Sequence, residues 1–229
     1  MAPQSELENA EPGVERLKTT QYDAWYDSDR GRWIGQTELS LLLKRLDPQP
    51  GEGLLDVGCG TGWFTRRLSN IQGISVTGVD IDQDALAFAR TKDKLTRYLT
   101  ADARQLPFQD RQFDLVVSIT ALCFVEPWQE ALCEIVRVTR RRFVIVLLNR
   151  HSLLWKDKGQ HGGTGAYQGA YWHTAKEIRS AMAKLPVSRL QIDSAIFLPG
   201  GAMLSRLAEK LLPSQMPFGS ILLISGQPQ

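Results

Sequence analysis

The chain has 229 residues, of which 43% are hydrophobic and 23% charged, and its formal net charge is +2. This length suffices for one domain with a substantial core, and so mild a charge gives no strong signal for a nucleic-acid partner. Three cysteines without disulfide spacing fit a reducing compartment. No stretch reads as a signal peptide or a membrane span, so we expect a cytoplasmic protein.

The first part of the chain is polar and then helical. We expect a flexible N-terminal segment over residues 1–20, followed by a single domain at 21–229. Leucines at helical spacing predict a helix over 33–46, which the prolines that follow would end. The aromatic segment 22–27 before it reads, by itself, as an amphipathic stretch that docks its rings on the core.

A buried strand then runs into a glycine-rich turn, with the sequence Leu54-Leu55-Asp56-Val57-Gly58-Cys59-Gly60-Thr61-Gly62. Three glycines at alternate positions allow the backbone to bend sharply and to approach a ligand closely. A helix over about 61–69 presents unpaired amides at its start. A second strand at 74–79 leads to Asp80, whose carboxylate can accept hydrogen bonds from both hydroxyls of a ribose. The turn therefore indicates a nucleotide-type cofactor.

The spacing of the glycines separates two classes of cofactor. A dinucleotide turn needs a small third residue, so that the helix packs tightly and the pyrophosphate fits. That position is Trp63 when counted from Gly58, and Thr65 when counted from Gly60. Neither residue is small, which disfavours a nicotinamide-dependent oxidoreductase. An alternative without function remains, in which the glycines only form a tight strand-to-helix turn.

A second group of motifs follows the next strand. Asp102 precedes the sequence Leu106-Pro107-Phe108, and a strand is predicted over 113–118. A lone aspartate after a strand is more often a turn residue or a helix cap. Together with the G-x-G-x-G turn and Asp56, however, this order resembles the class I S-adenosylmethionine-dependent methyltransferases. It is most similar to their type 11 small-molecule group, which includes ubiquinone and menaquinone methyltransferases, and the resemblance covers about residues 50–150.

The resemblance implies an α/β fold with a doubly wound, seven-stranded, mostly parallel sheet of the Rossmann-like methyltransferase type, and an antiparallel last strand. It implies S-adenosylmethionine as methyl donor, S-adenosylhomocysteine as product, and no metal. Asp80 would bind the ribose and Asp102 the adenine amino group, and a segment like 22–27 folds over the cofactor in many members. The candidate cofactor-binding residues are Asp56, Gly58, Gly60, Gly62, Asp80, Ile81, Asp102, Ala103, Ser118 and Tyr22.

The second half of the chain continues the alternation of helices and strands. A helix over 127–138 and an apolar strand over 143–148 are predicted, and the basic run 140–142 between them reads as a solvated helix end. Thr174 and Glu177 form a capping box at the start of a helix over 175–184. Strands at 188–198 and 218–225, with a helix at 202–212 between them, would complete the sheet in the region 174–229.

The long connection over 149–173 contains alternating glycines and aromatics, and it emerges where ligands bind in open α/β sheets. We interpret it as a substrate lid, the alternative being an inert surface loop. It contains all three histidines, whose spacing fits no metal site. His173 or His161 could act as a general base, although a structural or solvated histidine is the commoner case. Cys123 reads as a packed thiol.

These observations predict methyl transfer to a small organic acceptor by direct in-line displacement. Alignment of the reacting atoms supplies about 7 to 11 kcal/mol, so the absence of a catalytic triad does not count against the prediction. Two alternatives remain: a protein that binds an adenosyl ligand without transferring methyl groups, and a methyltransferase that acts on protein or RNA. The modest charge and the aromatic lid favour a small acceptor.

Overall fold

The computed structural model describes residues 19–229, which form a seven-stranded sheet in the order β3-β2-β1-β4-β5-β7-β6. The strands are β1 (Gly53–Val57), β2 (Ser75–Asp80), β3 (Arg97–Thr100), β4 (Phe113–Ile119), β5 (Thr139–Leu148), β6 (Val187–Ala195) and β7 (Ile221–Pro228). The first five strands pair in parallel, and β7 runs antiparallel to both β5 and β6. The predicted mostly parallel sheet with an antiparallel last strand is confirmed.

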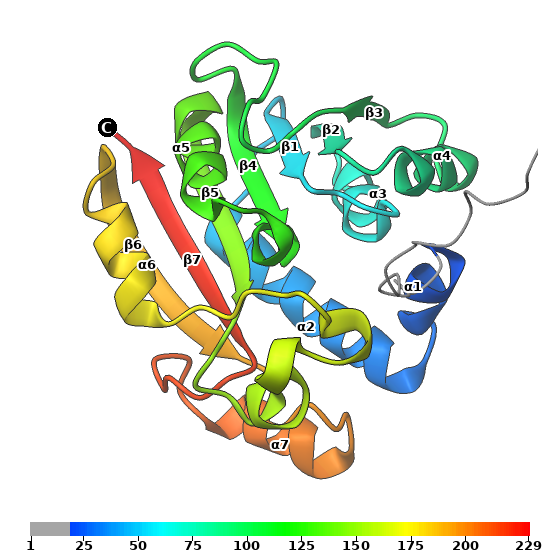
Figure 1. Cartoon of the computed structure of the whole chain (residues 1–229). Coiled ribbons are helices and arrows are strands. Elements are labelled where there is room, and N and C mark those ends of the chain that lie inside the picture. The colour runs from blue at the N-terminus through cyan, green and yellow to red at the C-terminus, as the bar shows by residue number, and fades with distance from the viewer. Residues whose placement is uncertain (1–18) are drawn as a thin grey trace, which may run out of the picture.

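Helices cover the two faces of this sheet (Figure 1). They are α1 (Thr19–Trp25), α2 (Asp29–Leu46), α3 (Trp63–Ser69), α4 (Gln83–Lys92), α5 (Trp128–Val138), α6 (Ala175–Met182) and α7 (Met203–Leu211). Successive strand residues point to opposite faces, so one core contains Leu55 and Val116 with α5 and α6. The other core contains Leu54 and Leu115 with α2 and α3.

Most predicted elements lie within a few residues of the observed ones. The capping box at α6 is confirmed, because Thr174 accepts from the Glu177 amide at 3.2 Å and the Glu177 carboxylate accepts from the Thr174 amide at 2.8 Å. Helix α2 begins earlier than predicted, since the Ser28 hydroxyl caps it by accepting from the Gly31 amide at 3.0 Å. The expected flexible segment 1–20 falls almost wholly on residues 1–18, which lie outside the described part.

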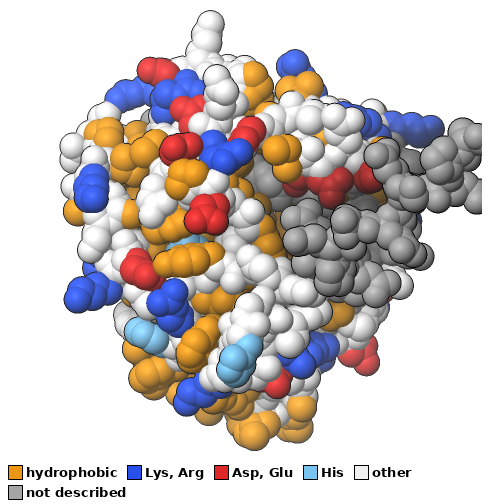
Figure 2. All heavy atoms as spheres, in the orientation of Figure 1, with side chains coloured by type: hydrophobic (Ala, Val, Ile, Leu, Met, Phe, Trp, Pro, Cys, Tyr) orange, Lys and Arg blue, Asp and Glu red, His pale blue; other side chains and the backbone are white. Residues whose placement is uncertain are grey.

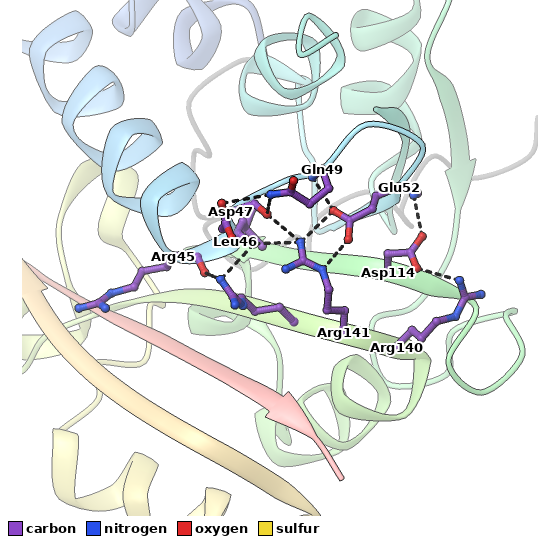
Figure 3. Close-up of polar contacts among 10 residues, drawn as sticks. Arg45, Leu46, Asp47, Gln49, Glu52, Asp114, Arg140 and Arg141 are labelled. Carbon is purple, nitrogen blue, oxygen red and sulfur yellow. Dashed lines mark hydrogen bonds and ion pairs between the residues drawn. The ribbon is translucent and has the colours of Figure 1, made fainter. Parts of the chain in front are cut away.

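The sequence suggested that the basic run 140–142 is a solvated helix end, but these residues lie near the beginning of the strand β5. The pairing of β5 with β4 shifts register here, which leaves room for the extra residue. Arg140 contacts the Asp114 carboxylate at 2.7 Å, and Arg141 contacts that of Glu52 at 2.5 Å (Figure 3). These carboxylates offset the charge of the two arginines within the strand.

Helix α7 turns its polar side inward. Ser205 is buried, and the Glu209 carboxylate accepts from the amides of Ile196 and Phe197 at 2.8 and 3.2 Å. Its large apolar side chains are exposed, and they gather at the bottom of the view in Figure 2. Within residues 19–229, no helix is both long enough and apolar enough to cross a membrane.

Candidate active site

A cleft of about 480 Å³ opens at the carboxyl ends of β1, β2 and β4. In open α/β sheets this is the edge where ligands bind. Eight of the ten predicted cofactor-binding residues line it, from four separate parts of the chain: Tyr22, Asp56, Gly58, Gly60, Asp80, Ile81, Asp102 and Ala103. Segments far apart in the sequence therefore meet at one place, as the motif order indicated.

The glycine turn adopts a backbone that glycine alone takes readily, with φ of 75°, 51° and 74° at Gly58, Gly60 and Gly62. A Cβ at Gly58 would lie 2.1 Å from that of Ala121, and one at Gly62 would lie 2.7 Å from the Tyr98 hydroxyl. A Cβ at Gly60 would meet no atom within 4 Å. Gly58 and Gly62 are thus required by packing, whereas Gly60 leaves its open side to the cleft and fits a ligand lying against the backbone.

Asp80 connects the end of β2 to this turn. Its carboxylate accepts from the Gly60 amide at 2.6 Å and from the Asp82 amide at 2.9 Å. Burial raises the pKa of Asp80, and these two hydrogen bonds oppose the rise because they stabilise the ionised form. Each carboxylate oxygen keeps a further lone pair, so Asp80 can hold the turn and still accept from a ligand hydroxyl.

Asp56 lies beneath the turn and is 2% exposed. Its one side-chain partner in residues 19–229 is the Thr65 hydroxyl, which donates at 2.7 Å. Burial raises the pKa of Asp56 to about 7, in spite of that hydrogen bond. Thr65 occupies a position where a dinucleotide turn needs a small residue. Here its hydroxyl provides a hydrogen bond to the buried carboxyl of Asp56.

Trp63 fills the space next to the turn, as expected from its size. It is buried, it stacks on Tyr26 with ring centroids 4.2 Å apart, and the Arg67 guanidinium lies 3.4 Å above its ring. Asp23 in α1 pairs with Arg66 in α3 at 2.9 Å, which holds the aromatic segment in place. Both interpretations of that segment have support: Tyr26 docks on the core, while Tyr22 is 37% exposed and lines the cleft.

Asp102 lies after β3 and is paired with Arg104. The Arg104 guanidinium donates to it at 2.7 and 3.1 Å, and the Arg104 amide donates at 2.8 Å. These hydrogen bonds hold the pKa of Asp102 below its usual value. Arg104 also donates to the Glu126 carbonyl at 2.6 Å, so it ties the β3 end of the cleft to the segment that follows β4. Sequence motifs gave no signal for Arg104.

Two predicted cofactor residues do not line the cleft. Gly62 begins α3 and packs against Tyr98. Ser118 is fully buried in β4, and the residues that follow it, Ile119 and Thr120, line the cleft instead. The end of the strand, rather than its serine, thus lines the cleft.

Neither candidate histidine reaches the cleft. His173 is fully buried between Trp128 and Tyr171, with ring centroids 4.8 and 4.7 Å away. Its amide donates to the Leu148 carbonyl at 2.8 Å, which adds a strand-like residue beside the end of β5 and turns the ring into the core. Burial lowers the pKa of His173 to about 4, and His161 is exposed on the surface.

The connection 149–173 is not structureless, since it contains short helical turns at Trp155–Gly159, Gln160–Gly162 and Gly165–Tyr167. Part of it lines the cleft, through Gly165, Ala166 and Gln168. Phe124 and Glu126, which follow β4, also line the cleft and lay outside every motif. Within residues 19–229, no group of three or more His, Cys, Asp or Glu side chains could hold a metal ion.

Comparison with known proteins agrees with this geometry. Residues 55–147 match the family model described as a methyltransferase domain. A malonyl-[acyl-carrier protein] O-methyltransferase of Buchnera aphidicola is 34% identical over 107 residues, covering 47% of this chain and 43% of that protein. An uncharacterized protein of Mycobacterium tuberculosis is 35% identical over 178 residues, covering 71% of this chain and 55% of that protein. The chain spans about half the length of the curated relatives it matches.

Solved structures share the fold. A S-adenosylmethionine-dependent methyltransferase of Thermotoga maritima, described as a possible histamine N-methyltransferase, superposes with a TM-score of 0.73 at 22% identity, covering 92% of this chain and 96% of that one. Geranyl diphosphate C-methyltransferase of Streptomyces coelicolor, in complex with S-adenosylhomocysteine, gives a TM-score of 0.67 at 16% identity, covering 95% of this chain and 86% of that one. The fold is that of the class I methyltransferases. Residues 55–147 thus match a methyltransferase domain, on a chain whose fold is that of S-adenosylmethionine-dependent methyltransferases.

Proposed function

We propose that this protein transfers the methyl group of S-adenosylmethionine to a small organic acceptor. One observation carries the proposal: in a chain that matches a methyltransferase domain, the glycine turn, Asp80 and Asp102 face a single cleft at the carboxyl edge of the sheet. S-adenosylmethionine supplies a methyl group on a sulfonium sulfur, which a nucleophile displaces in line to leave S-adenosylhomocysteine.

The residues of the cleft have separable tasks in this proposal. Asp80 accepts from the two ribose hydroxyls while it holds the Gly60 amide. Asp102 accepts from the adenine amino group, and Arg104 fixes the orientation of its carboxylate. Ile81 and Ala103, which adjoin these two aspartates in the cleft lining, contact the adenosine. Several carboxylates facing one cleft favour a positively charged ligand, which a sulfonium is.

The second half of the cleft receives the acceptor. Phe124 and Gln168 line the cleft and are not among the predicted cofactor residues, so they would exclude water there and align the nucleophile with the methyl group. We propose the segment 149–173 as the lid that completes this half, within a single domain at 21–229. None of the three histidines, all of which lie in the described part of the chain, lines the cleft, so an acceptor that is itself a good nucleophile, or one with a low pKa, suits the site best.

Three further observations support the small acceptor and the cellular setting. The cleft volume of about 480 Å³ is that of a small-molecule site, and a cofactor would take much of it. The similar geranyl diphosphate C-methyltransferase acts on a small molecule by its name. The three cysteines are free, which supports a cytoplasmic location. The proposed reaction uses no metal.

The test is to incubate the purified protein with methyl-labelled S-adenosylmethionine and cell extract, and to separate extractable small molecules from precipitated macromolecules. We expect label in the extractable fraction with the parent protein and a strong reduction with Asp80→Ala. Label confined to the precipitate would contradict the small acceptor. Binding of S-adenosylhomocysteine without transfer to any fraction would favour a binding protein.

A further inference from the structure

A second cavity, of about 250 Å³, lies at the opposite end of the sheet from the cleft. It is formed where the end of α2 meets the beginning of β5 and the paired strands β6 and β7. Four cationic side chains line it: Lys44, Arg45, Arg142 and Arg189. A concave surface that gathers cations from α2, β5 and β6 concentrates positive potential inside it.

In the part of the chain that the structure describes, a carboxylate pairs with one of these four cations. The Arg45 guanidinium pairs with the Asp193 carboxylate and donates to the Gln191 side-chain oxygen at 2.5 Å. Within residues 19–229, no ion pair involves Lys44, Arg142 or Arg189. The cavity therefore keeps three positive charges that no carboxylate of the described residues neutralises.

The arginines next to Arg142 in the sequence, unlike Arg142 itself, are paired with carboxylates of the described residues. Figure 3 shows Arg140 and Arg141 directed at the carboxylates of Asp114 and Glu52, next to the end of α2. The next residue, Arg142, instead donates to the carbonyls of Arg45 and Leu46, at 2.9 and 3.4 Å. Those contacts use one nitrogen of its guanidinium and leave the others to a ligand.

The lining of the cavity is also held in position. Because the oxygen of the Gln191 amide accepts from Arg45, its NH₂ group remains as a donor in the cavity wall. Arg189 has a left-handed backbone with φ of 51°, at the register shift between Ser188 and Gln191. A residue other than glycine adopts this conformation at a cost, and such outliers concentrate at functional sites.

We propose that this cavity binds an anion that carries one or more phosphate groups and at least two negative charges in total, held by Lys44, Arg142 and Arg189. Guanidinium groups suit phosphate oxygens because they donate two parallel hydrogen bonds, and a lysine adds a compact charge. The phosphate belongs to a free small molecule, or to the backbone of a polynucleotide. The site is separate from the methyl-transfer cleft, and it holds whether or not the proposed reaction does.

The test is a calorimetric titration of the purified full chain with inorganic pyrophosphate at low ionic strength, without S-adenosylmethionine. Arg189→Gly removes one cation and suits the left-handed backbone, so this variant should fold at least as well as the parent. Lys44→Ala removes an exposed cation from the other side of the cavity. Arg179→Ala, at an exposed position of α6, is the matched control that lowers the net charge equally.

We expect saturable binding to the parent, a loss of about tenfold or more in affinity for Arg189→Gly and Lys44→Ala, and no change for Arg179→Ala. Competition of a short single-stranded oligonucleotide with pyrophosphate, with the same dependence on Arg189, would assign the phosphate to a polynucleotide. The absence of competition would assign it to a small molecule. Absence of saturable pyrophosphate binding to the parent, or an equal loss in Arg179→Ala, would overturn the proposal.

Discussion

The Asp80 carboxylate accepts a hydrogen bond from the Gly60 amide at 2.6 Å, although the two residues are twenty positions apart. This contact joins the end of β2 to the glycine turn after β1, so the residue proposed to bind the ribose also fixes the loop beside it. Loss of the side chain should therefore weaken the cofactor site in two ways.

Asp80→Ala should reduce the affinity for S-adenosylhomocysteine by at least about tenfold, since it removes one or two charge-assisted hydrogen bonds of about 1.5 to 3 kcal/mol each. Asp80→Asn keeps an acceptor of the same shape and should fall between the parent and the alanine variant. Equilibrium dialysis of the three proteins gives the order directly. An unchanged dissociation constant for Asp80→Ala would rule out the role given to this residue.

Gly58 and Gly60 form a matched pair for alanine substitution. At Gly58 the new methyl group would lie 2.1 Å from Ala121 with φ of 75°, so we expect a loss of about 2 to 5 kcal/mol in the free energy of unfolding. At Gly60 there is open space, so only the left-handed backbone opposes alanine, at about 1 to 2 kcal/mol. Urea unfolding measures both values.

Ligand affinity should depend on Gly60 more strongly than stability does. Alanine at Gly60 adds a methyl group that faces the cleft, so it should lower the affinity for S-adenosylhomocysteine more than its modest loss of stability explains. Full affinity in a folded Gly60→Ala variant would show that no ligand lies against this part of the backbone.

His173 should act as a pH-sensitive structural residue rather than as a base. Its folded pKa of about 4 lies below the ordinary value of 6.5, so its contribution to stability is present above about pH 6.5 and is lost as the pH falls toward 4. His173→Phe keeps a ring between Trp128 and Tyr171 and should remove about 1 to 3 kcal/mol of this dependence. Thermal unfolding across pH 4 to 8 measures it.

Methyl transfer separates the two interpretations of His173. We expect the His173→Phe variant to keep the activity of the parent at pH 8, because the ring lies in the core and not in the cleft. A folded variant without activity would mean that the histidine does reach the acceptor.

Glu38 has the opposite dependence on pH. This buried residue of α2 has a pKa of about 8 because of desolvation, so its contribution to stability is present below about pH 4.5 and is lost as the pH rises through 8. Glu38→Gln should be more stable than the parent by about 1 to 3 kcal/mol at pH 9, and the difference should vanish at acid pH. Glu130→Gln, at an exposed position of α5, is the control and should show no such trend.

The sequence predicted those parts of the site that depend on local backbone and on strand order. The glycine turn, Asp80 and Asp102 each follow a strand, and parallel strands bring their carboxyl ends to one edge. It missed Arg104, whose role depends on a carbonyl beyond the next strand. It also misjudged the run 140–142, because the neutralising carboxylates come from β4 and from the residue before β1.

In the segment 149–173, too, the sequence did not predict the contacts that depend on tertiary packing. Nothing in the spacing of the histidines reveals that His173 pairs its backbone with the end of β5, which turns the ring away from the cleft. The contribution of Gln168 depends in the same way on how the short helical turns of the segment fold back toward the cleft. Such contacts arise from tertiary packing, which local sequence patterns do not encode.

The central claim is that the cleft binds S-adenosylmethionine through the glycine turn and Asp80. Calorimetric titration of the purified protein with S-adenosylhomocysteine, and separately with NAD, tests it most directly. The account predicts saturable binding of one S-adenosylhomocysteine per chain, weakened by Asp80→Ala, and no binding of NAD, because Trp63 fills the space that a pyrophosphate turn requires. Binding of NAD in place of S-adenosylhomocysteine would contradict it.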